Sequence, residues 1–208
     1  MNKKEVLDAL AEIRKKGAET IYIEAKQAKG GIPQKYYDTV SSFANTFGGI
    51  ILFGVNQVII NSKTTFEITG IDNIADIQQK ITNLCSTEFE PVVRPEILIV
   101  NVEEKDILAV KINEINQIDK PCFYKPKGMV KGSYTRVGDR DDLMTDYEIY
   151  KLKSYKENIQ DDLRPVVRAK IDDLDDEKLE DYILKVKKDK PNFAKFDKEK
   201  ILLLSGSL

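Results

Sequence analysis

The alternation of apolar and polar residues predicts a helix and then a strand at the start of the chain. Over residues 6–13 the apolar side chains recur every three or four positions among charged ones, which predicts an amphipathic helix that ends at Gly17. Residues 20–26, TIYIEAK, then alternate as a strand with one buried face does. In this strand Glu24 and Lys26 share the polar face.

A second helix and a buried strand are expected next. Pro33 suits a first helical turn, and the apolar spacing continues to about Thr46, where two glycines end the helix. The nearly continuous apolar run from Ile50 to Val55 predicts a strand buried on both faces. A double glycine is also typical of phosphate loops, but those loops precede a helix rather than follow one. We therefore assign a structural role to Asn45, Gly48 and Gly49.

Strand pairs and helices alternate in the rest of the chain. Residues 56–73 and 96–112 each resemble two strands joined by a polar turn, with helical spacing over 74–88 between them. Residues 121–140 supply a strand, a basic loop, a second strand and a glycine turn, and helical spacing returns over 145–159. This order predicts an α+β fold with a mixed, mostly antiparallel sheet, flanking helices and a C-terminal helical extension.

The chain is expected to contain one domain followed by a connector. Residues 1–160 form the predicted domain, and residues 161–208 are interpreted as a linker and helical connector, with a helix that begins near Asp175. The chain ends soon after the apolar run from Ile201 to Leu204. We therefore expect a longer natural protein, whose missing C-terminal half would be a partner of this part.

Composition excludes several classes of function. The 208 residues include no histidine, which removes catalytic mechanisms and zinc sites that depend on imidazole. Cys85 and Cys122 lie far apart without metal-ligand neighbours, which predicts reduced thiols. The N-terminus lacks the apolar run of a signal peptide, and no later stretch has the length of a membrane span. We expect a cytoplasmic protein with no membrane partner.

Basic residues gather in one segment although 33 basic and 35 acidic residues nearly cancel overall. Residues 120–140 contain six bases and one acid, whereas residues 141–181 contain fourteen acids and seven bases. The basic segment predicts a surface for nucleic-acid phosphates, and a solvated lysine-rich hairpin is the alternative. The predicted nucleic-acid contacts are Lys125, Lys127, Lys131, Tyr134, Arg136 and Arg140, with Lys26, Lys29 and Lys35 as a second cluster.

The strand around Glu24 has three interpretations that residue spacing alone leaves open. Glu24-Ala25-Lys26 matches half of a metal-dependent nuclease site, in which the lysine would stabilise charge on the phosphate. Alternatively, Glu19 and Glu24 bind a divalent cation together with a third carboxylate. In the third interpretation Glu24 and Lys26 form an ordinary exposed ion pair. Under the first two, the catalytic residues are Glu19, Glu24 and Lys26, and the metal ligands are Glu19 and Glu24.

Several ordered motifs together resemble one family. The stretches YIEAKQA, IPQKYYDTVSSFANTFGGIILFGV and SYTRVG follow one another as they do in the Schlafen AlbA-like domain, over roughly residues 19–152. The resemblance implies a DNA-binding or other nucleic-acid-binding module of a bacterial transcriptional regulator, with DNA or RNA as partner and no required cofactor. It also implies pairing into a homodimer.

The same resemblance implies an alternative function. Schlafen relatives that cleave structured RNA use three carboxylates, two of which match Glu19 and Glu24, while the third, an aspartate, falls at Asn56 or Gln57. The alternative is a divalent-metal-dependent endoribonuclease that uses Mg²⁺ or Mn²⁺. A neutral amide in place of a carboxylate weakens such a site. Asp72 would replace the missing acid only if the fold brought it close.

Overall fold

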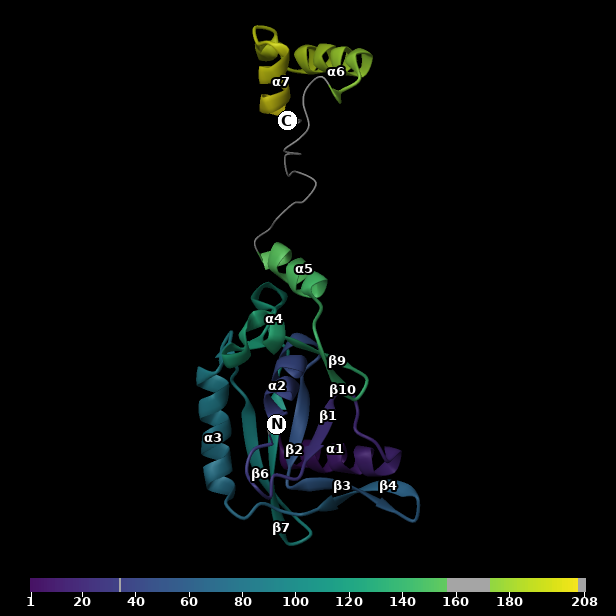
Figure 1. Cartoon of the computed structure of the whole chain (residues 1–208), viewed down its shortest axis with the longest axis vertical. Coiled ribbons are helices and arrows are strands. Elements are labelled where there is room, and N and C mark those ends of the chain that lie inside the picture. The colour runs from purple at the N-terminus through teal and green to yellow at the C-terminus, as the bar shows by residue number, and fades with distance from the viewer. Residues whose placement is uncertain (34, 157–172, 206–208) are drawn as a thin grey trace. The chain divides into compact units, whose positions relative to one another are not determined.

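The computed structural model describes residues 1–33, 35–156 and 173–205 (Figure 1). Its contacts divide the chain into two compact units, Met1–Ile159 and Gln160–Leu208. The helices of the first unit are α1 (Lys3–Lys16), α2 (Tyr36–Asn45), α3 (Ile74–Thr87), η1 (Gln117–Asp119), η2 (Lys125–Lys127), α4 (Gly128–Gly132) and α5 (Asp146–Lys156). Its strands are β1 (Ile23–Lys26), β2 (Gly49–Phe53), β3 (Val55–Ile60), β4 (Lys63–Ile68), β5 (Phe89–Glu90), β6 (Glu96–Val102), β7 (Lys105–Ile112), β8 (Phe123–Tyr124), β9 (Tyr134–Val137) and β10 (Arg140–Leu143).

A four-stranded mixed sheet forms the centre of the first unit, in the order β1-β2-β7-β6. β1 runs parallel to β2, and the other two pairs are antiparallel. Three further two-stranded pairs, β3-β4, β5-β8 and β9-β10, surround this sheet. The predicted α+β class, with a mixed and mostly antiparallel sheet and flanking helices, is confirmed.

Both faces of the central sheet are covered, which explains the continuous apolarity of its inner strands. Ile51 and Phe53 of β2 pack toward α2 and α3 in one core cluster. Leu52, between them, packs toward α1 and the β3-β4 hairpin in a second cluster. Successive side chains of a strand point to opposite faces, so a strand buried on both sides needs apolar residues throughout.

Local sequence signals account for the ends of α1. Asn2 accepts a hydrogen bond from the backbone of Glu5, and the Glu5 carboxylate accepts one from the backbone of Asn2, which completes a capping box. At the other end Gly17 adopts a left-handed conformation with φ of 67°. The helix predicted from the first apolar pattern is therefore confirmed.

The double glycine forms the tight reversal from α2 into β2. Gly48 has φ of 70°, and a Cβ there would lie 2.7 Å from the carbonyl oxygen of Ile112. A Cβ on Gly49 would lie 2.6 Å from the ring of Phe43. Both positions thus lack room for a side chain, and the first also needs a conformation that glycine tolerates best.

Two local predictions need correction, and a third is tested only in part. The strand expected over Ile50–Val55 ends at Phe53, because Gly54, with φ of 86°, breaks it before β3 begins. The basic stretch expected to be a loop forms η2 and the short helix α4. The helix expected over 145–159 is described as α5 as far as Lys156, and the rest of its predicted span lies outside the described residues.

The second unit contains α6 (Asp176–Asp189), η5 (Pro191–Phe193) and α7 (Lys198–Ser205). Asp175 caps α6 by accepting a hydrogen bond of 3.1 Å from the backbone of Lys178, so the predicted helix start is confirmed. Part of the apolar run near the end of the chain is buried: Ile201 and Leu202 pack against α6, whereas Leu203 is 66% exposed. In the described parts of both units, no helix is long and apolar enough to cross a membrane.

Candidate functional site

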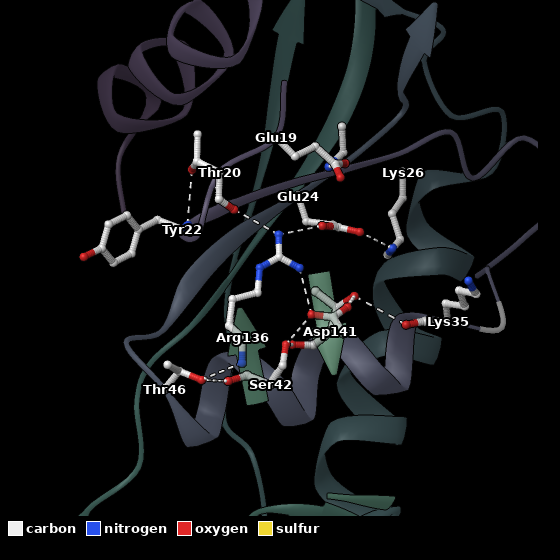
Figure 2. Close-up of polar contacts among 12 residues, drawn as sticks. Glu19, Thr20, Tyr22, Glu24, Lys26, Lys35, Ser42, Thr46, Arg136 and Asp141 are labelled. Carbon is white, nitrogen blue, oxygen red and sulfur yellow. Dashed lines mark hydrogen bonds and ion pairs between the residues drawn. The ribbon is translucent and has the colours of Figure 1, made fainter. Parts of the chain in front are cut away.

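Arg136 lies at the centre of a buried ionic cluster between β1, α2 and the β9-β10 hairpin (Figure 2). Its Nη1 donates to Asp141 Oδ1 at 2.7 Å, and its Nη2 donates to Glu24 Oε2 at 2.8 Å. Nη2 also donates to the carbonyl oxygen of Thr20 at 2.9 Å. Only 4% of Arg136 is exposed, so these are desolvated charge pairs. We call Arg136, Glu24, Asp141 and Lys26 the ionic cluster.

Hydroxyl groups of α2 complete the partners of Asp141. Thr39 Oγ1 donates to Asp141 Oδ2 at 2.7 Å, and Ser42 Oγ donates to Asp141 Oδ1 at 2.5 Å. The backbone amide of Arg136 donates to Thr46 Oγ1 at 3.0 Å. Two hydroxyls of α2 and one at its C-cap therefore hold the β9-β10 hairpin. The two that donate to Asp141 fill acceptor positions of a largely buried carboxylate.

The charge state of Arg136 follows from this setting. Burial disfavours the charged guanidinium, but the carboxylates of Glu24 and Asp141 outweigh burial, so the pKa of Arg136 is raised. The guanidinium carbon also lies 5.0 Å from the centre of the Phe43 ring, a cation–π distance. Arg136 is thus a permanent cation whose charge is balanced inside the protein. It was predicted to contact phosphate, and that prediction is wrong because its guanidinium does not reach the surface.

Glu24 and Lys26 share one face of β1, as predicted, but that face is covered. Lys26 Nζ lies 2.7 Å from Glu24 Oε1, and the side chains are only 10% and 11% exposed. The interpretation as an ordinary exposed pair is therefore wrong. Both oxygens of Glu24 have cationic partners, one in Lys26 and one in Arg136.

Glu19 lies beside this pair but makes a different contact. Its Oε1 accepts a hydrogen bond of 2.7 Å from the backbone of Ala25 (Figure 2). Burial and the nearby carboxylate of Glu24 raise the pKa of Glu19 from 4.5 to about 7, against the opposing effects of the Ala25 amide and Lys26. Glu19 therefore holds its proton to a higher pH than an exposed glutamate does.

The carboxylates do not fit the metal site that the family resemblance implies. Among the described residues, no group of three Asp, Glu, Cys or His side chains is placed to hold one ion. Asn56 is half-buried and Gln57 exposed on β3, and Asp72 is exposed and does not complete a set with Glu19 and Glu24. Glu24 is also neutralised by two cations, which oppose the approach of a third positive charge.

Two of the remaining predicted contact residues are engaged with each other. Lys127 Nζ lies 2.8 Å from Asp38 Oδ1 and 3.2 Å from the Tyr134 hydroxyl oxygen. Hydrogen bonding to Asp38 raises the pKa of Lys127, partly offset by burial. This lysine is exposed but already neutralises a carboxylate on α2, so its main effect is to join η2 to α2.

The other basic residues of the prediction are exposed. Lys29 lies in the loop before α2, and Lys35 is the residue that precedes the first turn of this helix. Lys125 belongs to η2, Lys131 to α4 and Arg140 to β10. Arg140 is 3.4 Å from Asp142, a long pair whose arginine side chain is 72% exposed. The other four make no ion pair within the described residues. We call Lys29, Lys35, Lys125 and Lys131 the lysine face.

Asn45 links α2 to the segments on either side of η2 and α4, which carry Lys125 and Lys131. Its Nδ2 donates to the carbonyl oxygens of Cys122 at 2.8 Å and Tyr134 at 3.0 Å. Its Oδ1 accepts from the backbone amide of Cys122 at 2.6 Å. A single buried amide thus connects a helix to chain positions more than seventy residues away, which extends the local role expected of it.

The sequence analysis missed Asp141, Thr39 and Ser42 as members of the site. Asp141 was grouped with the acidic segment, yet it pairs directly with Arg136 in the β9-β10 register. The glycine turn at Gly138 could have revealed this pairing, because a short hairpin with its turn there sets Asp141 opposite Arg136. The two hydroxyls gave no signal, since Thr and Ser are common on helices.

Comparisons with known proteins agree with this fold. The family model described as "Schlafen, AlbA_2" matches residues 19–145. The N-terminal domain of a RecG-related protein from Nitrosomonas europaea is 29% identical, with a TM-score of 0.54 over 66% of this chain and 92% of that one. The DIP2311 protein of Corynebacterium diphtheriae is 19% identical, with a TM-score of 0.45 over 96% of this chain and 42% of that one. No curated protein matches the chain. By the family match, which covers more than half of its length, the chain belongs to the Schlafen AlbA_2 family.

Proposed function

We propose that the first unit is a nucleic-acid-binding module that contacts phosphates through the lysine face, with Arg140 beside it. The observation that carries this proposal is the meeting of the two basic clusters at α2. Lys127 ties η2 to α2 through Asp38, and Thr39 ties β10 to α2 through Asp141. Lys35 at the start of α2 and the basic residues of η2 and β10, about a hundred positions later, are therefore attached to the same helix.

The neutralisation of nearby acids supports this function. Asp38 and Asp141 would otherwise repel phosphate, but Lys127 and Arg136 balance them. The exposed lysines are then the uncompensated charges of this surface. Lysine is a compact charge that attracts phosphate without reading bases, so binding should depend on salt and only weakly on sequence.

The structural similarity to a solved domain supports the same class of function. The similar N-terminal domain from Nitrosomonas europaea belongs to a protein named for its relation to a DNA helicase. Within a bacterial transcriptional regulator, such a module would supply general affinity for DNA or RNA, and other parts of the protein would supply selection of the target. A metal-dependent endoribonuclease is not favoured, because Glu24 already pairs with two cations and, in the part of the chain that the structure describes, no third carboxylate completes a site.

Charge removal with a matched control tests the proposal. A fluorescent 20-base-pair DNA duplex is titrated at 50 mM KCl with the wild-type chain and with Lys125→Gln/Lys131→Gln. The control, Lys15→Gln/Lys63→Gln, removes two exposed lysines from α1 and β4, which cover the other face of the sheet.

The lysine-face variant should bind at least about tenfold more weakly, because two phosphate contacts are lost, and the control should match the wild type. Equal losses in both variants would overturn the proposed surface. No measurable binding by the wild type to DNA, or to an RNA of the same length, would overturn the function.

A further inference from the structure

Helix α5 exposes aromatic rings together with lysines. Tyr147 is 67% exposed and Tyr155 is 62% exposed. Lys151 lies between them in sequence, with its Nζ 5.7 Å from the centre of the Tyr147 ring. Each of these three residues lies four positions after the previous one, so they follow one side of the helix. The opposite side carries Ile149, which is buried and anchors the helix.

The two acids at the start of α5 do not make this helix an acidic surface. Asp146 and Glu148 occupy the first turn, where negative charge is favourable to the helix. Glu148 Oε2 accepts hydrogen bonds of 2.8 Å from both the backbone amide and the hydroxyl of Thr145. These bonds lower the pKa of Glu148, whose carboxylate thereby serves as a helix cap. The next two turns carry Lys151, Lys153 and Lys156 and no acid.

The lysines of α5 continue toward the proposed phosphate surface. Lys153 and Lys156 line a hollow of about 260 Å³ together with Met129 of α4 and with Lys120, which is buried and pairs with Glu114. α4 also carries Lys131, a member of the lysine face. α5 packs against η1, and residues of α5 and α4 line the same hollow. The hollow also contains Glu90 and Asp119, so phosphates that reach α5 would be held by the exposed lysines of the helix itself.

From this arrangement we propose that α5 is a stacking platform for unpaired bases, so that the preferred ligand is single-stranded nucleic acid. The proposal rests on the proposed function and deepens it. Exposed aromatic rings alternating with lysines suit a single strand, because every base offers a face for stacking while its phosphate meets a cation. In a duplex the base faces are covered by their neighbours and cannot stack on a side chain.

The spacing of the rings suits this ligand. Tyr147 and Tyr155 are eight positions apart, which corresponds to about 12 Å along the helix axis. A stacked strand advances about 3.4 Å per nucleotide, so the platform spans roughly three nucleotides. The ligand class is defined by its base faces and phosphates.

A comparison of single-stranded and duplex probes tests the platform. Fluorescent (dT)20 and a 20-base-pair duplex are titrated with the whole chain, with Tyr147→Ala/Tyr155→Ala, and with Tyr147→Phe/Tyr155→Phe. Tyr22→Ala is the control, because Tyr22 is 52% exposed but lies on the side of α1 and not on α5. Thermal unfolding verifies that all variants fold.

The wild type should prefer (dT)20, and the double alanine variant should lose at least about fivefold in affinity for it, with little change for the duplex. The phenylalanine variant and the Tyr22 control should bind (dT)20 like the wild type. Photocrosslinking with 5-iododeoxyuridine should label the peptide that contains Tyr147 or Tyr155.

Duplex binding that matches (dT)20 binding, or an alanine variant that binds (dT)20 normally, would overturn the platform and leave the lysine face intact. Absence of binding to both probes would overturn the proposed function and the platform together.

Discussion

Removal of the Arg136 side chain tests whether the ionic cluster holds the β9-β10 hairpin in place. In Arg136→Ala, the carboxylates of Glu24 and Asp141 lose their shared partner while remaining largely buried. Deleting one partner of a buried ion pair typically costs about 3 to 5 kcal/mol. With a urea dependence of about 2 kcal/mol per M, the unfolding midpoint should fall by roughly 2 M. Arg140→Ala removes an exposed arginine four positions away and should change the free energy of unfolding by less than about 1 kcal/mol.

Thiol labelling offers a readout confined to the first unit. Cys85 and Cys122 are both fully buried in its core, so they react only when that unit opens. Labelling is followed against urea for the wild type, Arg136→Ala and Arg140→Ala. Arg136→Lys is included because it keeps the charge but loses the two-pronged geometry, and an intermediate midpoint is expected. If Arg136→Ala unfolds at the same urea concentration as Arg140→Ala, the structural role assigned to Arg136 is refuted.

Three further predictions concern the surroundings of the cluster. Folding raises the pKa of Glu19 from 4.5 to about 7, so the folded protein binds this proton more tightly than the unfolded chain does. The free energy of unfolding should therefore fall as the pH rises through this interval, by at most about 3 kcal/mol. Glu19→Gln should therefore be more stable than the wild type at pH 8 and similar at pH 4.5, and a difference independent of pH would contradict this. Gly49→Ala should lower the urea midpoint of unfolding, because the new Cβ would lie 2.6 Å from the Phe43 ring. Gly30→Ala is the control, because a Cβ at Gly30 meets open space and should leave the midpoint unchanged. Equal midpoints for the two variants would contradict this prediction. Addition of 1 mM Mn²⁺ should leave the thermal midpoint unchanged, and a metal-dependent rise that Glu24→Gln abolishes would restore the metal-site interpretation.

Most helices and strands could be predicted from apolar periodicity. The first helix, the buried strand after the double glycine and the 96–112 hairpin all correspond to elements of the structure. These signals are local, because a helix or strand that packs against a core must repeat its apolar residues at a fixed interval. The extent of the strand after Gly49 was overestimated because apolarity continues through Gly54, where the backbone turns.

The site was harder to predict because its partners are distant in sequence. The motifs identified Glu24 and Arg136 separately, but their 2.8 Å contact joins positions 112 residues apart. Charge alone assigned Arg136 to the surface with the neighbouring lysines, since a count of basic residues does not report burial. Whether a strand residue is buried or exposed depends on what packs against its face of the strand. For Arg136, α2 and β1 cover that face.

The salt dependence of binding tests the lysine face most directly. The equilibrium constant for a 20-base-pair duplex is measured from 50 to 200 mM KCl for the wild type and for a variant with all four lysines of the face changed to Gln. If each lysine neutralises one phosphate, the slope of log K against log salt should be less steep in the variant than in the wild type by about 3.6. Equal slopes for the two proteins would contradict nucleic-acid binding through the lysine face.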